Sequence, residues 1–236
     1  MDRVSWARLE DAIGRRGGVS FWWRDDDAAL PTPALERLMR FDVPLALAVV
    51  PQLAVPELFH LLRDSVSVLQ HGADHRNRAG PTEKKTEFPE SEPDALALER
   101  LSAGALRLKK LAGDRALPVL VPPWNRIRPG LAEKLSSISM IGLSRDGTAR
   151  PISGLKQVNT HIDIVAWREG KRFIGEDQAL AAALELMELT SPVGWLTHHA
   201  VHDEAAWRFL ERLARIEGVR WASAPELFSY TAAGHG

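Results

Sequence analysis

The chain has 236 residues, of which 45% are hydrophobic and 26% are charged, and its formal net charge is -1. These values are ordinary for a globular protein, and they provide no electrostatic field that would attract nucleic acid or an anionic membrane. The sequence contains no cysteine, which excludes disulfides and thiolate metal sites. Any metal would therefore be held by histidine, carboxylate or water.

The opening segment, MDRVSWARLEDAIGRRGG, is charged and amphipathic and contains no apolar core of a secretory signal. No stretch approaches the ~18 continuous apolar residues that a membrane-spanning helix needs. These two observations predict a cytoplasmic protein without a membrane or nucleic-acid partner. They leave the oligomeric state open.

Short apolar runs alternate with helical patterns along the chain. Strands are predicted at residues 19–23, 44–50, 65–71, 117–123, 139–144, near 158–165, at 193–199 and at 219–223. Helices are predicted at residues 33–40, 55–64, 94–113, 131–138, 176–190 and 203–218, with a short last helix after residue 223. Residues 76–93 are polar, contain three prolines and predict a long loop.

This alternation implies parallel strands joined by helical crossovers. Polar clusters follow several predicted strands, and in a barrel the carboxyl ends of the strands form one mouth where active sites lie. We therefore predict an α/β fold, a distorted (β/α) barrel of about seven parallel strands. A single domain would cover residues 1–236, with 76–93 as a rim loop that could act as a lid and 231–236 as a frayed tail.

The run RDDDA at residues 24–28 places three consecutive carboxylates at the end of an apolar strand. Such a run repels itself unless water or a cation neutralises it. Because strand side chains alternate, Asp25 and Asp26 would face different ways and suit different roles. One could bind a metal while its neighbour accepts a proton from water, although a solvated turn or a helix cap is the alternative.

The segment HGADH at residues 71–75 follows another predicted strand. Two imidazoles four residues apart can reach one ion if the chain turns, and Gly72 would permit a tight turn. Together with one aspartate, His71 and His75 would make a three-ligand site suited to Zn²⁺, Co²⁺, Ni²⁺ or Fe²⁺. The alternative is a surface turn with two solvated histidines.

Two further segments carry polar side chains at predicted strand ends. In THHAVHD (197–203), either His198 or His199 could act as a general acid, while the others could cap a helix or fill the rim. In VPPWNR (121–126), two prolines would fix a turn that presents Trp124 to a sugar. Asp163 could orient a catalytic group, or form a structural ion pair.

In this order, the segments resemble the polysaccharide deacetylase superfamily, carbohydrate esterase family four. RDDD (24–27) resembles the family's Thr-Phe-Asp-Asp motif, and HGADH resembles His-(Ser/Thr)-x-x-His with glycine in place of the hydroxyl residue. VPPW (121–124) resembles Arg-Pro-Pro-Tyr, and Leu196-Thr197-His198 resembles Leu-x-His. The resemblance extends from residue 19 to about residue 203 and implies a distorted barrel that removes acetyl groups from sugars.

The resemblance also implies roles for individual residues. It makes Asp25 the base and His198 the acid, with Asp26, His71 and His75 as ligands of a divalent metal, Zn²⁺ before Co²⁺, Ni²⁺ or Fe²⁺. From the residues themselves, Trp124, Asn125 and Arg126 are candidates for substrate binding. Further candidate site residues are Asp27, His199, Asp163 and Arg24.

Two departures from the family pattern leave alternatives open. Val121 occupies the position of the family's third-motif arginine, so Arg24 or Arg126 would have to supply its bond to the base aspartate. The additional aspartate also permits a shift by one residue, with Asp26 as the base and Asp27 as the ligand.

The function predicted from the resemblance is a metal-dependent hydrolase that removes an acetyl group from an N- or O-acetylated carbohydrate. One alternative is a metal-dependent amidohydrolase that acts on a small non-sugar amide. Another is a carbohydrate-binding relic of the fold without catalysis, and a third is a purely structural cluster without a metal.

Overall fold

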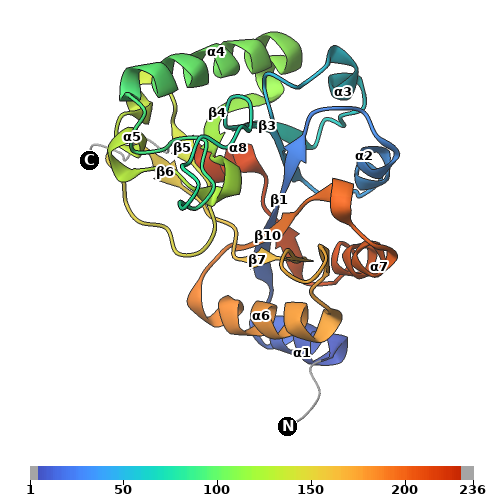
Figure 1. The fold of residues 1–236 in the computed structure, drawn as a ribbon. Coiled ribbons are helices and arrows are strands. Elements are labelled where there is room, and N and C mark those ends of the chain that lie inside the picture. Colours follow the sequence, from blue (N-terminus) through green and yellow to red (C-terminus); the bar gives the residue numbers. More distant parts are fainter. Residues whose placement is uncertain (1–4, 230–236) are drawn as a thin grey trace, which may run out of the picture.

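The computed structural model describes residues 5–229 and is built around one curled sheet (Figure 1). Its hydrogen-bonded strands follow the order β6-β5-β4-β3-β2-β1-β10-β7, and β11 also pairs with β1. All pairs in this sheet are parallel, whereas β8 and β9 form a separate antiparallel pair. The strands are β1 (Val19–Ala28), β2 (Leu45–Val49), β3 (Val66–His71), β4 (Ala116–Val121), β5 (Gly142–Leu143), β6 (Lys156–Gln157), β7 (Ile162–Asp163), β8 (Val165–Ala166), β9 (Arg172–Phe173), β10 (Val193–Thr197) and β11 (Val219–Trp221).

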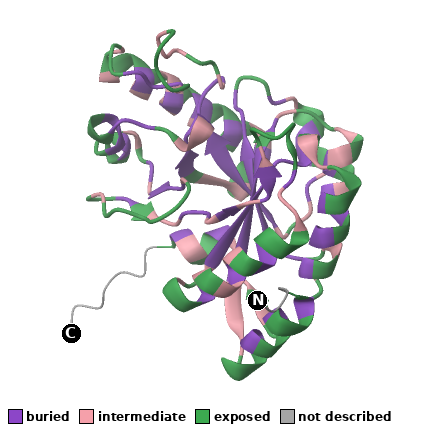
Figure 2. Cartoon of the chain, turned by 60° about the horizontal axis from the view of Figure 1, so that its bottom comes forward, coloured by how far each residue is buried: buried purple, intermediate pink, exposed green. Residues whose placement is uncertain are grey.

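Helices surround the sheet on the outside, with buried strands in the centre and exposed helix faces at the periphery (Figure 2). The α-helices are α1 (Trp6–Arg15), α2 (Pro33–Leu38), α3 (Pro56–His60), α4 (Asp94–Ala112), α5 (Pro129–Ala132), α6 (Glu176–Leu189), α7 (Glu204–Leu213) and α8 (Ala224–Phe228). None of the helices in residues 5–229 combines the length and the apolar composition that crossing a bilayer requires.

The central strand β1 separates two apolar layers because its side chains alternate. Phe21 and Trp23 point outward and join the large core between the sheet and the helices. Trp22 points into the barrel lumen, where its ring centroid lies 6.4 Å from that of Phe228 on α8. Because β11 pairs with the start of β1, this packing fills the amino-terminal end of the lumen, and the polar residues lie at the opposite end.

The predicted fold class is confirmed: the sheet is parallel and curled, and helical crossovers cover it. β1 runs to Ala28, beyond the predicted end at residue 23, because residues 24–28 continue to pair with β2. Strands β5 to β9 have two residues each, and such short strands have no hydrophobic periodicity that the sequence could reveal. The predicted frayed tail, 231–236, lies outside the described residues.

Candidate active site

The three consecutive aspartates of β1 point in three directions. The register between β1 and β2 shifts between Asp25 and Ala28, and Asp27 has a φ of 70°. An irregularity of this kind is a β-bulge, which re-aims the side chains beyond it, and aspartate is one of the residues that tolerate a positive φ. Asp27 therefore does not follow Asp25 to the outer face of the sheet, as strict alternation would require.

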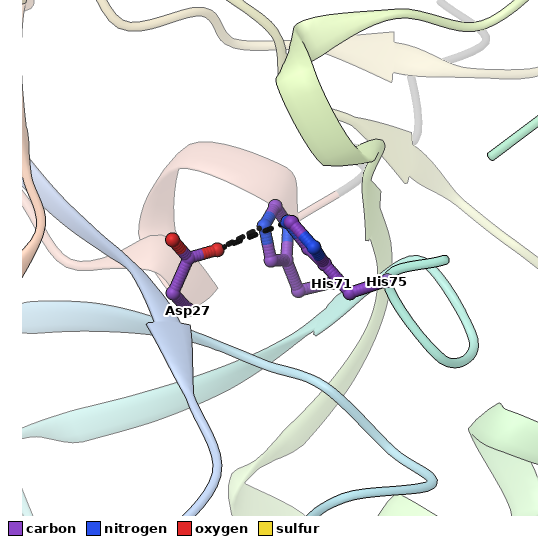
Figure 3. Close-up of side chains that lie close together, drawn as sticks. All are labelled: Asp27, His71 and His75. Carbon is purple, nitrogen blue, oxygen red and sulfur yellow. Dashed lines mark hydrogen bonds and ion pairs between the residues drawn. The ribbon is translucent and has the colours of Figure 1, made fainter. Parts of the chain in front are cut away.

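Asp27 lies against the two histidines of the HGADH segment (Figure 3). Its Oδ1 is 3.0 Å from His71 Nε2 and 3.1 Å from His75 Nε2. One ligand atom from each of these residues lies within 4.8 Å of the others, a spacing that suits a shared metal ion. Burial alone would raise the pKa of Asp27, but the hydrogen bonds from both histidines outweigh it and hold that pKa well below its usual range.

The backbone fixes the orientation of the first histidine. His71 Nδ1 lies 3.0 Å from the carbonyl oxygen of Val121, which is placed to accept its proton and leaves Nε2 directed at Asp27. A histidine that donates through one nitrogen to a carbonyl presents the other nitrogen to a metal. Burial would lower the pKa of His71, yet the hydrogen bond to Asp27 and the charge of Asp26 raise it.

A buried carboxylate from the rim loop holds the turn that carries the second histidine. Glu87 is 0% exposed and accepts the backbone N–H groups of Ala73 at 2.9 Å and His75 at 3.1 Å. Gly72 has a φ of +59°, and a Cβ there would stand 2.1 Å from Glu87 Oε2. The glycine at the family's hydroxyl position therefore makes room for Glu87, and residues 76–93 are anchored to the barrel at this point.

Asp26 points into the lumen and is held by Arg24, which is fully buried. Arg24 donates through Nε to Asp26 Oδ1 at 2.8 Å and through Nη2 to Asp26 Oδ2 at 2.9 Å. The same guanidinium reaches across the lumen to Ser144 Oγ at 2.7 Å and to Asn125 Oδ1 at 2.9 Å. Asp26 was assigned as a metal ligand from the sequence, but the structure places Asp27 beside the histidines and Asp26 beside an arginine.

Asp25 points to the outer side of the sheet and forms a closed network. Its Oδ1 is 2.5 Å from His199 Nδ1, and its Oδ2 accepts the Thr197 hydroxyl at 2.5 Å and the His199 backbone N–H at 3.0 Å. Burial would raise the pKa of Asp25, but the charge of His199 and the hydrogen bonds from His199 and Thr197 together lower it. The structure thus places Asp25, which the resemblance makes the base, in a network with Thr197 and His199 and not beside His71 and His75.

His198 and His199 face opposite sides of the chain. His198 Nδ1 lies 3.9 Å from Asp163 Oδ1, and its ring packs edge-on against Trp167 with centroids 4.6 Å apart. Trp167 in turn donates to Asp163 Oδ2 at 2.7 Å. Burial raises the pKa of Asp163 against the lowering effect of the His198 charge. The charge of His198 also contributes to the low pKa of Asp27.

The turn after β4 contributes an aromatic ring to the mouth of the barrel. Trp124 has a φ of 55°, is half-buried, and its ring centroid lies 4.6 Å from that of His75. Asn125 accepts from Arg24, as described above, whereas Arg126 donates to the carbonyl oxygen of Lys85 at 2.8 Å. Of the three residues assigned to substrate binding, Trp124 and Asn125 thus border the site, and Arg126 lies on its outer rim.

Sequence reasoning missed two members of the site. Glu87 lies in a polar loop where nothing in the sequence distinguishes it from its neighbours, and its close approach to Gly72 is visible only in the structure. Trp167 lies only four residues after Asp163, and its position next to a strand was the available signal.

No protein-family model matches the chain, and no curated protein sequence matches it. Several solved structures do. A family 4 carbohydrate esterase from Streptomyces lividans has a TM-score of 0.58 at 15% identity, over 87% of this chain and 92% of that one. The peptidoglycan deacetylase PdaC from Bacillus subtilis has a TM-score of 0.57 at 14% identity, over 89% of this chain and 90% of that one.

A family 4 acetyl xylan esterase from Clostridium thermocellum, in complex with a cobalt ion, has a TM-score of 0.52 at 14% identity, over 89% of this chain and 90% of that one. At such identities the likeness concerns the fold alone. The resemblance predicted from the motifs is confirmed at that level: the chain has the barrel fold of polysaccharide deacetylases and family 4 carbohydrate esterases.

Proposed function

We propose that the protein is a divalent-metal-dependent hydrolase that removes acetyl groups from a carbohydrate. The observation that carries this proposal is the meeting of Asp27, His71 and His75, with Asp26 next in the chain. The structural neighbours include an esterase that binds cobalt and a deacetylase that acts on peptidoglycan, and these support the reaction class.

The donor set fits a divalent cation such as Zn²⁺. Two imidazole nitrogens and one carboxylate oxygen are the ligands of an open catalytic site, and three protein ligands leave positions for water and substrate. The carbonyl oxygen that faces His71 Nδ1 and the Glu87 carboxylate that accepts the His75 backbone N–H provide the outer hydrogen bonds that orient ligands in such sites. When bound, the metal would supply a Lewis acid for the acetyl carbonyl and lower the pKa of water.

Asp26 acts as the general base in this proposal, which follows the one-residue shift that the sequence left open. Arg24 makes the bond to the base aspartate that the family obtains from its third-motif arginine, the position of Val121 here. Both oxygens of Asp26 keep lone pairs beyond those that Arg24 uses. Asp26 is thereby fixed in orientation and remains able to accept a proton from the attacking water.

His198 acts as the general acid and protonates the leaving nitrogen or oxygen. Asp163 and Trp167 orient its ring from the side. A backbone N–H in the turn around Trp124 would stabilise the oxyanion of the tetrahedral intermediate. Asp25 and His199 take no part in proton transfer and instead brace the end of β10.

Two tryptophans support a sugar as the substrate. Trp124 stands beside His75, and Trp167, which is 42% exposed, stands beside His198. Trp124 follows β4 of the main sheet, and Trp167 follows β8 of the separate antiparallel pair, so the two rings come from distant segments of the chain. Such rings pack against the apolar faces of sugars while their polar edges remain hydrated.

The test is elemental analysis of the purified protein, combined with acetate release from N-acetylated oligosaccharides and O-acetylated xylan in the presence of Zn²⁺ or Co²⁺. We expect one metal per chain and released acetate, with both lost in His71→Ala. His60→Ala, at an exposed histidine of α3, serves as the control and should change neither. Wild-type turnover in His71→Ala with the metal still bound would overturn the proposal.

A further inference from the structure

A cavity of about 310 Å³ lies on the rim between the 76–93 loop and the turn after β4. Cationic side chains outnumber anionic ones in its lining. Its charged members are Lys84, Arg126, Arg128, Arg145, Glu83 and Glu90.

Two residues that line the cavity accept hydrogen bonds from Arg24, the side chain that holds the proposed general base, Asp26. Asn125 lines it and accepts from Arg24 at 2.9 Å. Arg145 lines it as well, and its backbone carbonyl accepts from the same guanidinium at 3.2 Å. Because Arg24 also holds Asp26, one buried side chain connects the cavity wall to the site where the acetyl group would react.

Several of these cations lack an acidic partner. In the part of the chain that the structure describes, no carboxylate lies within 4.0 Å of Lys84, Arg126 or Arg145. Arg128 differs from these three because its guanidinium is paired with Asp94. Three cationic side chains without an acidic partner in one cavity lining favour an anionic oxygen ligand.

We propose that this cavity binds a carboxylate of the substrate, so that the acetylated carbohydrate is an acidic one, such as a chain containing uronic acid. This inference rests on the proposed deacetylase function for its place beside the reacting group.

The test compares two tetrasaccharides with N-acetylglucosamine units: a hyaluronan fragment, which carries glucuronate carboxylates, and chitotetraose, which is neutral. Binding is measured by calorimetry in the presence of a chelator, so that hydrolysis does not intervene. We expect hyaluronan tetrasaccharide to bind at least tenfold more tightly at low salt, and the preference to shrink as salt is added.

Arg145→Gln should remove most of that tenfold preference. Arg150→Gln makes the same charge change at an exposed residue that does not line the cavity, and it should keep the preference. Equal binding of the two sugars to the wild-type protein, or a preference that survives in Arg145→Gln, would overturn the inference. Acetate release is measured separately with Zn²⁺: its absence with both sugars would count against the proposed function, while the binding preference alone decides the carboxylate site.

Discussion

Asp25 and Asp27 lie two residues apart on β1, and each forms a cluster with histidines from other segments of the chain. The two clusters differ in how many oxygens of the carboxylate have hydrogen-bond partners. Asp25 is 0% exposed, and both of its oxygens are occupied by His199 and Thr197. The Asp27 side chain is 39% exposed, and one oxygen faces the Nε2 atoms of His71 and His75. The residue types are the same, but only the second cluster offers a carboxylate oxygen and two imidazole nitrogens to a common point.

In the proposed function, this difference in hydrogen bonding separates a structural carboxylate, Asp25, from a proposed metal ligand, Asp27. The hydrogen bonds of Asp25 all go to other members of the first cluster, which is buried in the outer core near α2 and the residues after β10. The second faces the mouth of the barrel because the bulge at Asp27 turns it there. Asp26, between them, belongs to neither cluster because Arg24 holds it in the lumen.

The comparison predicts the largest loss for Asp27→Asn. Replacing one carboxylate oxygen by an amide removes an anionic ligand, so we expect elemental analysis to find no bound metal and acetate release to be abolished. The fold should remain, because the side chain is partly exposed, and circular dichroism would check this. Asp42→Asn, at an exposed aspartate, is the matched control. A full metal content in Asp27→Asn would remove this residue from the ligand set.

Asp26→Asn should lower kcat by about 10²–10⁴-fold, the usual contribution of a general base, while the metal content stays at one per chain. Steady-state kinetics and elemental analysis on the same preparation would measure kcat and the metal content. Loss of the metal in this variant, with Asp27 intact, would instead restore Asp26 as the ligand and shift the base back to Asp25.

Asp25→Asn should act on stability. Removing one partner of a buried ion pair leaves the other uncompensated, which costs about 3–5 kcal/mol in the free energy of unfolding. Urea denaturation would measure the loss. The folded variant should still bind one metal per chain, and failure to do so at a temperature where the protein is folded would connect the two clusters functionally.

The smallest effect is expected for Glu87→Ala. The backbone of HGADH would lose the acceptor that positions His75, and outer partners of this kind change metal affinity by about 10–100-fold. Competition with a metal-binding dye would give the dissociation constant for Zn²⁺. Glu57→Ala, at an exposed glutamate of α3, is the control. An unchanged dissociation constant in Glu87→Ala would mean that Gly72 and the loop position His75 without the carboxylate.

The sequence predicted the architecture well because short apolar runs alternate with helical patterns, and the structure has the same alternation of strands and helices. It also placed Asp25 and Asp26 on opposite faces, since that needs only the two-residue period of a strand. The bulge at Asp27 was not predictable, because it depends on the pairing with β2. The one-residue shift that makes Asp26 the base and Asp27 the ligand therefore remained an open alternative.

The choice between His198 and His199 follows from the same period. Residues of β10 alternate between the outer core and the lumen, and the alternation continues into both histidines. One therefore meets Asp163 and the other meets Asp25. The partners themselves lie far apart in the sequence, so no local pattern could have assigned them.

The position of β1 also has a consequence for how the chain reaches this fold. Its first neighbour, β2, follows within the next residues, but its other edge pairs with β10, and its start pairs with β11. At synthesis rates of about 5–20 residues per second, the FWW segment waits for roughly 10–40 seconds before these strands emerge. Contacts of such long sequence separation make folding slow, and an unpaired apolar strand is prone to aggregate. The strand that carries all three aspartates is therefore the segment for which a nascent chain most needs a chaperone.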